Sequence, residues 1–142
     1  MTSADTHDRP RSPLFLAMLD EVREICVALP EVNEIETFHS PTWQAGKKSF
    51  AELVPYEDGA VLSFKADPAE SAALLENDRF YVPKYTGHKG WLSLRLDRAQ
   101  GIDAPITSAD GVDWGEVEEL IEGSYRIQAL KRMLAALDRD AG

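Results

Sequence analysis

The sequence has little that would support redox, membrane or secretory chemistry. It contains one cysteine, Cys26, which excludes an intrachain disulfide and a cluster of thiolate metal ligands. Its apolar runs all fall well short of the roughly 18 residues that span a bilayer, so no membrane partner is expected. Residues 1–13 hold no continuous apolar stretch, do not resemble a secretory signal, and are expected to form a disordered tail. Together these features predict a cytoplasmic protein.

The common catalytic and nucleotide-binding motifs are also missing from the sequence. No glycine-rich phosphate loop follows a predicted strand, and the sequence has neither a Gly-x-Ser-x-Gly elbow nor a His-Glu-x-x-His pair. His7 lies in the predicted tail, and His39 and His88 have no second metal ligand at helical or turn spacing. Because no nucleophile, base and orienting group can be assembled, we expect no enzymatic activity, no cofactor and no resident metal.

Acidic residues outnumber basic ones, 25 against 15, and give a net charge of −10. Such a field repels nucleic acid over roughly a Debye length and disfavours nonspecific duplex binding. The charge is segregated along the chain, however. Residues 79–98 carry five basic residues against Asp97 and predict a local basic patch. Residues 99–124 carry seven carboxylates and no Lys or Arg, which is typical of a solvated acidic face.

The 142 residues fit one domain with its own core. Ser12-Pro13, followed by apolar residues at spacings of three and four, predicts an amphipathic helix that ends at Pro30 and buries Cys26. Residues 35–65 alternate short β-rich runs with turns, the strongest at Asp58-Gly59, and predict a β-meander. Asp67-Pro68 then opens a short helix that ends near residue 76.

The run Trp91–Leu96 alternates strictly and predicts a strand. We expect Leu92, Leu94 and Leu96 to face the core, and Ser93 and Arg95 to face away from it. A loop over residues 98–112 precedes a capped helix from Asp113, and apolar periodicity continues to the C-terminus in the same helix or in a second one. The sequence therefore predicts an α+β domain over residues 14–142, an antiparallel sheet with the N- and C-terminal helices packed on one face.

The segment Tyr85-Thr86-Gly87-His88-Lys89-Gly90-Trp91 is the strongest candidate for a functional turn. Two glycines bracket a His-Lys pair between aromatics, which suits an anionic or planar ligand. The same pattern also suits a purely structural turn, with His88 buried and hydrogen-bonded to backbone. Similarly, Arg126, Lys131 and Arg132 either bind phosphate or balance the acidic turn before them.

Four motifs, in order, carry a resemblance to a known family. They are Leu29-Pro30-Glu31-Val32, the run from His39-Ser40-Pro41-Thr42-Trp43 to Gly46-Lys47-Lys48-Ser49-Phe50-Ala51, Gly87-His88-Lys89-Gly90-Trp91, and Ser124-Tyr125-Arg126 through Lys131-Arg132. Over residues 14–137 the chain resembles the MmcQ/YjbR family. The resemblance implies a compact α+β fold similar to that of frataxin or CyaY, also described as a double-wing domain. It further implies a DNA-binding role, with no established enzymatic activity.

The resemblance and the local charge together predict a small binding module with DNA as the suggested partner. The candidate contacts are basic and aromatic residues: Lys47, Lys48, Lys84, Tyr85, His88, Lys89, Trp91, Arg126, Lys131 and Arg132. Lysines and arginines would meet phosphates, and Trp43, Tyr85 or Trp91 would stack on a base if exposed. Because the total charge opposes it, binding to nucleic acid is expected to be weak and electrostatic.

Two other classes of function stay open. A protein-binding or small-molecule-binding domain would use the turn from Gly87 to Trp91 as a pocket wall and would show a concave site with converging polar groups. A frataxin-like metal-binding role would use carboxylates, because hard cations prefer oxygen ligands. The acidic residues that would serve are Asp20, Glu21, Glu24, Glu31 and Glu34.

Overall fold

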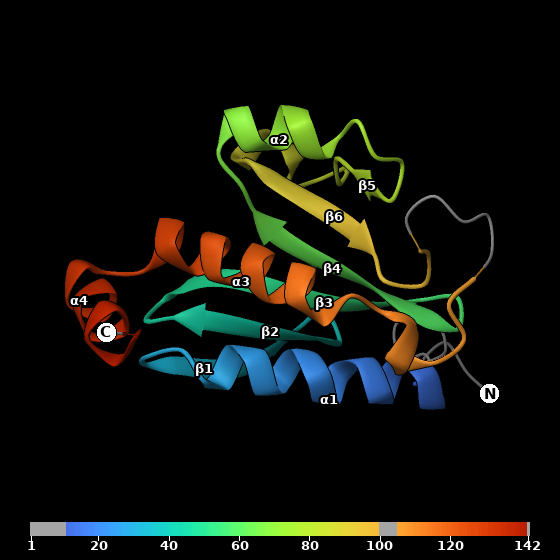
Figure 1. Ribbon diagram of the computed structural model, residues 1–142, viewed down its shortest axis with the longest axis horizontal. Coiled ribbons are helices and arrows are strands. Elements are labelled where there is room, and N and C mark those ends of the chain that lie inside the picture. The colour runs from blue at the N-terminus through green and yellow to red at the C-terminus, as the bar shows by residue number, and fades with distance from the viewer. Residues whose placement is uncertain (1–10, 100–104, 142) are drawn as a thin grey trace.

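The computed structural model describes residues 11–99 and 105–141 (Figure 1). Six strands form one sheet: β1 (Val32–Thr37), β2 (Ser40–Ala45), β3 (Lys48–Tyr56), β4 (Gly59–Lys65), β5 (Phe80–Tyr81) and β6 (Trp91–Arg95). The helices are α1 (Pro13–Val27), α2 (Pro68–Leu74), α3 (Trp114–Gln128) and α4 (Lys131–Ala141), with single 3₁₀ turns η2 (Gly87–Lys89) and η3 (Ala109–Gly111).

Helix α1 begins as its sequence predicts. The Ser12 hydroxyl accepts a hydrogen bond from the Phe15 amide, and Pro13 is the first helical residue, one position before the predicted domain boundary. Residues 1–10 of the predicted tail lie outside the described residues.

The apolar stripe of α1 is buried, and burial raises the pKa of the Cys26 thiol far above its usual value. Cys26 is therefore an inert core residue.

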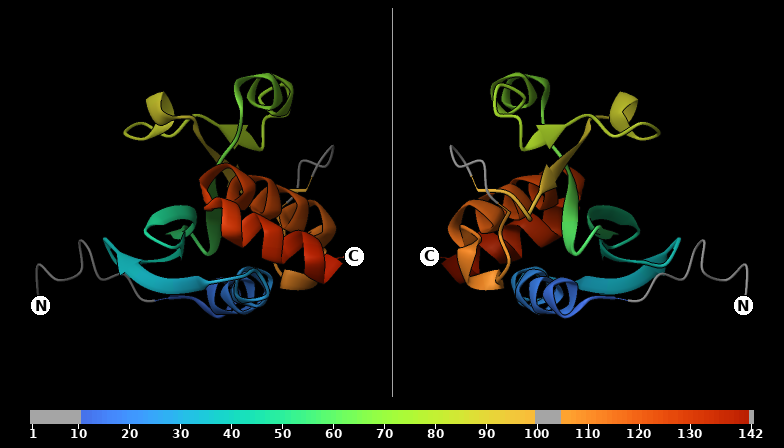
Figure 2. Two further views of the ribbon diagram at one scale, coloured as in Figure 1. Left: turned by 90° about the vertical axis from the view of Figure 1, so that its left-hand side faces the viewer. Right: turned by 90° about the vertical axis from the view of Figure 1, so that its right-hand side faces the viewer.

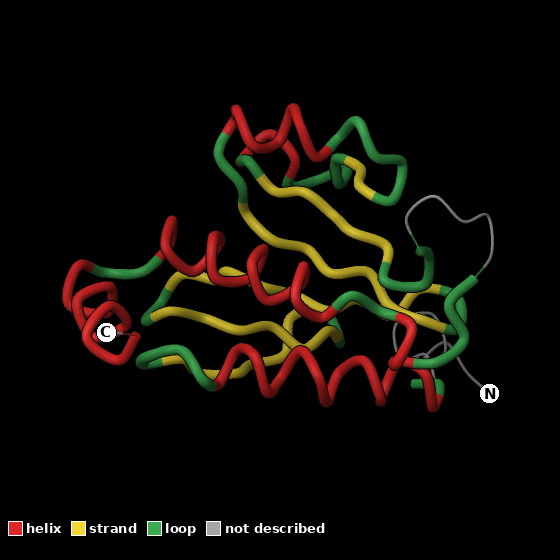
Figure 3. The backbone as a smooth tube through the Cα atoms, in the orientation of Figure 1, coloured by secondary structure: helices red, strands yellow, loops and turns green. Residues whose placement is uncertain are grey.

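The sheet has the strand order β1-β2-β3-β4-β6-β5, and every neighbouring pair is antiparallel (strands in yellow in Figure 3). Strands β1 to β4 form the predicted meander. Helices α1 and α3 pack on one face of the sheet, whereas the β1–β2 hairpin and the segment around η2 project on the other side (Figures 1 and 2). The prediction of an α+β domain with an antiparallel sheet and terminal helices on one face is confirmed.

The turn between β3 and β4 lies one residue earlier than the Asp58-Gly59 dipeptide suggests. Tyr56 pairs with Gly59, so Glu57 and Asp58 form the two-residue loop, and the positive φ of 51° belongs to Glu57. Gly59 is instead the first strand residue. An added side chain there would press against Asp97, so close packing is what requires glycine at this position.

A β-bulge decides which strand residues face the helices. The register between β2 and β3 shifts between Trp43 and Gln44, and the extra residue lets the adjacent residues Phe50 and Ala51 both lie in the helix-side core. Beyond the bulge, strict alternation sends Ala51 and Leu53 toward the helices and Glu52 toward the opposite face.

The predicted facing of β6 is confirmed for its leucines. Leu92, Leu94 and Leu96 are buried in the helix-side core. Ser93 faces the other way, as predicted, but it is only 2% exposed. Its hydroxyl lies 3.0 Å from that of Ser63 on β4, so the face away from the helices has its own buried polar centre.

The C-terminal periodicity forms two helices. Asp113 caps α3, and the chain leaves the helix after Gln128 before α4 begins at Lys131. Ser124 bridges α3 to the sheet, because its hydroxyl donates to the Phe50 carbonyl at 2.6 Å and accepts from the Lys65 amide at 2.8 Å. Within residues 11–99 and 105–141, no helix combines the length and apolar character needed to cross a membrane.

Candidate binding groove on the open face of the sheet

The predicted basic contacts come from several separate elements of the fold. Lys47 lies in the β2–β3 turn and Lys48 begins β3, whereas His88 and Lys89 lie on η2. Arg126 of α3 donates to Glu122 and Asp138, and Arg132 of α4 forms a bidentate ion pair with Glu31. For the two arginines the charge-balancing interpretation is therefore the better one.

Several lysines, including Lys65, which was not a predicted contact, lie at one end of the sheet. Strand β3 begins at Lys48, β4 ends at Lys65 and β6 begins just after Lys89, and adjacent antiparallel strands bring these termini to the same end. Lys131 starts α4, whose Met133 packs against the β2–β3 turn at Gly46. No ion pair to these lysines is formed within the described parts of the chain.

The turn from Gly87 to Trp91 depends on both glycines. Gly90 has a φ of 91°, and a Cβ on Gly87 would lie 2.2 Å from a methyl carbon of Val82. The turn leaves His88 and Lys89 exposed and Trp91 half-buried. The interpretation of His88 as a buried, hydrogen-bonded core residue is therefore wrong.

Two other sequence hypotheses are corrected by burial and pairing. Trp43 is fully buried beneath the helices and donates its indole N–H to Glu34, so it cannot stack on a base. Glu34 also binds Arg23 bidentately, and Glu31 is paired with Arg132. Among the described residues, no group of three histidine, cysteine or acidic side chains is placed to hold a metal ion.

The face of the sheet away from α1 and α3 carries a concave groove of about 420 Å³. Its floor comes from β3, β4 and β6, and its walls are the β1–β2 turn and the segment after β5. The residues that line this open-face groove are Thr37, Phe38, Glu52, Val54, Tyr56, Val61, Ser63, Tyr81, Pro83, Lys84, Tyr85, Thr86 and Ser93. The groove thus brings together segments up to 56 positions apart in the sequence, from Thr37 to Ser93.

A polar row crosses the floor of the groove. The strand register places Glu52 opposite Ser63, Ser63 opposite Ser93, and Ser93 opposite Tyr81. Burial raises the pKa of the Glu52 carboxyl and that of the Tyr81 phenol. These groups are therefore partly desolvated, and each favours its uncharged form.

Aromatic rings flank the polar row on both sides. Phe38, in the β1–β2 turn, is 93% exposed and holds a φ of 49°, and Tyr85 across the groove is 79% exposed. A bulky residue with positive φ is uncommon and strained. The turn therefore holds an apolar ring in water at a conformational cost that packing in the free protein does not offset.

The predicted pair Lys84-Tyr85 lies on the wall of this groove. The Lys84 ammonium is 5.6 Å from the centre of the Tyr85 ring, within the range of a cation–π contact. Of the predicted site residues, only these two line the groove. The turn from Gly87 to Trp91, which was the expected pocket wall, follows directly after the wall segment instead.

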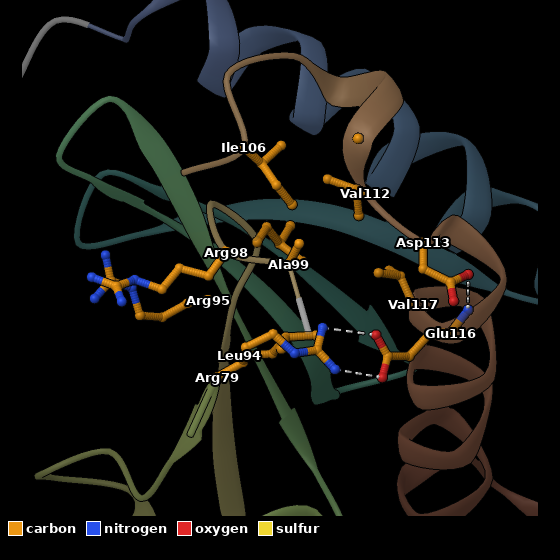
Figure 4. A pocket seen from close by; sticks show the side chains of 12 residues that line it. Arg79, Leu94, Arg95, Arg98, Ala99, Ile106, Val112, Asp113, Glu116 and Val117 are labelled. Atoms are coloured by element: carbon orange, nitrogen blue, oxygen red, sulfur yellow. Dashed lines mark hydrogen bonds and ion pairs between the residues drawn. The ribbon is translucent and has the colours of Figure 1, made fainter. Parts of the chain in front are cut away.

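A second cavity, of about 120 Å³, lies between β6 and the start of α3 (Figure 4). Two of its three arginines are already bound by carboxylates, and the third, Arg98, is exposed. Arg79, 7% exposed, donates to both oxygens of Glu116 at 3.0 and 2.9 Å, and Arg95 forms two hydrogen bonds to Asp97. The ion pair with Glu116 joins the sheet to α3, so this cavity is a structural junction.

Sequence reasoning missed the central residues of the groove: Phe38, Glu52, Tyr56, Ser63, Tyr81 and Ser93. A local signal existed on β3, where Glu52, Val54 and Tyr56 alternate with the core residues Ala51 and Leu53. Alternation assigns these residues to one face. It does not show that helices leave that face open, or which strands lie beside it.

Fold and groove together define an α+β domain whose sheet is covered by helices on one face and carries a ligand-sized groove on the other. The model of the YjbR family matches residues 27–127, which include every residue that lines the groove, and the chain belongs to this family. The predicted resemblance to MmcQ/YjbR is confirmed.

A solved structure shows a similar fold. The crystal structure of the Deinococcus radiodurans protein DR2400, a DUF419 domain, aligns with a TM-score of 0.57 at 20% sequence identity. The alignment covers 83% of this chain and 81% of that one. The comparison with curated proteins gives no match.

Proposed function

We propose that this protein is a non-catalytic binding module that holds a small planar organic ligand in the open-face groove. The observation that carries the proposal is the groove itself: about 420 Å³ between two exposed aromatic rings. Small-molecule sites commonly enclose about 300–1,000 Å³ and combine apolar walls with a few converging polar groups. Here the walls are aromatic, and the converging groups are the carboxyl and hydroxyls of the polar row.

Removal of either exposed ring is expected to weaken binding about 2- to 12-fold, because aromatic contacts contribute about 0.5–1.5 kcal/mol each. The variants are Tyr85→Ala and Phe38→Asn, since asparagine tolerates positive φ better than most residues. The measurement is titration of the labelled protein with small aromatic fragments, followed by NMR amide shifts.

Val27→Ala is the matched control, because Val27 is exposed on α1, which packs on the other face of the sheet. It should leave both the fragment affinities and the pattern of shifted amides unchanged. The proposal would be contradicted by fragments that shift amides only outside the groove. It would also be contradicted if fragments bound Tyr85→Ala and Phe38→Asn with the same affinity as the original protein.

Single-stranded nucleic acid is a second candidate ligand, favoured by the Lys84-Tyr85 pair and by the lysines at the end of the sheet. An exposed aromatic ring beside a cation is the element on which such strands stack. The net charge of −10 opposes binding, so any affinity should depend strongly on salt.

A labelled oligonucleotide tests this candidate by fluorescence anisotropy. We expect weak binding at about 50 mM salt that is largely lost by about 200 mM. Lys48→Ala and Lys89→Ala should reduce both the affinity and its salt dependence, whereas Arg126→Ala, which removes an already paired cation, should change neither. An unchanged anisotropy at low salt would eliminate nucleic acid as a ligand.

A further inference from the structure

Glu52 differs from its serine neighbours in the polar row because its carboxyl has no partner in the part of the chain that the structure describes. The Ser63 and Ser93 hydroxyls bond to each other, and Thr42, on the other side of Glu52, donates to the Ser40 carbonyl at 3.1 Å. No hydrogen bond or ion pair to Glu52 is formed among the residues that the structure describes. Burial is the cause of its raised pKa. Water still reaches the Glu52 oxygens, because no fully buried polar side-chain atom of the described residues lacks a partner, so the carboxyl is open to a ligand.

The rings around Glu52 present surfaces that accept positive charge. The guanidinium of Arg95 lies 4.7 Å from the centre of the Tyr56 ring, and the Lys84 ammonium lies over Tyr85. Aromatic faces combined with a carboxylate are a common arrangement for the recognition of organic cations. The net charge of −10 also concentrates cations near the protein and repels anions.

We propose that the open-face groove selects an organic cation, a protonated amine or amidinium on a planar apolar body, and that Glu52 is its counter-ion. This inference rests on the proposed function and names its ligand class. The charged head lies against Glu52 on the floor, and the apolar body lies between Phe38 and Tyr85. Lys84, on the wall, remains over the ring of Tyr85. Its positive charge repels any second positive group of the ligand from that side of the groove.

In the free protein the unpaired Glu52 carboxyl is expected to lower stability near neutral pH, which also supports a binding role for it. Its pKa is higher in the folded than in the unfolded chain, so its contribution to stability is present at low pH and is lost as pH rises through the folded pKa. Glu52→Gln should therefore leave the thermal midpoint near pH 7 unchanged or raise it. A residue that lowers stability at working pH is typical of a functional site.

Three isosteric probes separate the charge of the ligand from its shape: benzamidinium, neutral benzamide and anionic benzoate. Titration of the full chain, followed by NMR amide shifts, is expected to show benzamidinium binding at Glu52, Ser63 and Ser93 about tenfold more tightly than benzamide. Benzoate should bind least. Glu52→Gln should remove the preference for benzamidinium, and the control Glu24→Gln, an exposed carboxyl on α1, should retain it.

The pH dependence supplies a second readout. The titratable groups that face Glu52 are Lys84, Tyr56, Tyr81 and Tyr85. Glu52 is the only carboxyl among the residues that line the groove, so a change in the acid range reports it. Affinity for benzamidinium should fall as pH drops through the pKa of Glu52, while affinity for benzamide should not change.

The outcomes distinguish this inference from the proposed function. Equal binding of all three probes in the groove, or an unchanged affinity of Glu52→Gln for benzamidinium, would overturn the cation preference and leave the groove as a binding site. Absence of groove shifts with every probe up to about 10 mM would overturn both.

Discussion

Replacement of Leu94 by alanine is expected to lower the free energy of unfolding by about 2–5 kcal/mol. Leu94 is 1% exposed and lies on β6, opposite Leu62 on β4 and Phe80 on β5. The substitution removes buried methyl groups and leaves a cavity where two neighbouring strands and the helices meet. Urea denaturation monitored by circular dichroism measures the loss.

Leu16→Ala is the control for this substitution, because it removes the same atoms from a leucine at an exposed position of α1. The loss in free energy of unfolding for Leu16→Ala should stay within about 0.5 kcal/mol, as for most surface substitutions. Equal losses for Leu94→Ala and Leu16→Ala would show that β6 does not contribute its leucines to the core.

Loss of the carboxyl of Glu116 should also be costly, by about 2–4 kcal/mol, because it leaves the guanidinium of Arg79 buried without its counter-charge. Arg79 is almost fully buried, and its remaining contacts are Asn77, at 3.3 Å, and the ring of Phe80. The expected loss lies below that for a fully buried pair, because the Glu116 side chain of this ion pair (Figure 4) is 29% exposed. Denaturation of Glu116→Ala measures it.

Glu122→Ala tests whether the cost expected for Glu116→Ala comes from the burial of the Arg79 guanidinium. Glu122 pairs with Arg126 four residues later on the exposed surface of α3, and such pairs contribute at most about 1 kcal/mol. The double change Arg79→Met with Glu116→Leu should recover most of the stability, because it removes both charges together. A Glu116→Ala variant no less stable than Glu122→Ala would mean that Asn77 and Phe80 suffice to hold Arg79.

The placement of charge bears on which partner this protein selects. The sequence interpretation relied on ten basic and aromatic candidates, yet Arg126 and Arg132 are neutralised by carboxylates and only Lys84 and Tyr85 line the groove. A surface that recognises DNA backbone needs several unpaired cations in register with phosphates. The open-face groove offers one lysine and one unpaired carboxyl, which suits a small cationic ligand better.

The local patterns of the sequence determined the helices, the strands and the α+β class. Ser12-Pro13 and Asp113 specify helix starts by satisfying backbone amides, and the alternation from Trp91 to Leu96 specifies a face by the two-residue period of a strand. These effects act over a few residues. The Glu57-Asp58 turn was misplaced by one position because packing of Gly59 against Asp97, a distant contact, decided where the glycine belongs.

Only the tertiary structure decided which face of the sheet is open and which residues meet there. Trp43 and Tyr85 are equally plausible stacking residues in the sequence, but helices bury the first and leave the second exposed. Glu52 reads as one acidic residue among 25, and only the pairing of β3 with β4 and of β4 with β6 places it unpartnered beside Ser63 and Ser93. Burial and pairing depend on contacts between distant segments, so the two-residue period assigns Glu52 to a face, while the arrangement of strands and helices makes that face a binding groove.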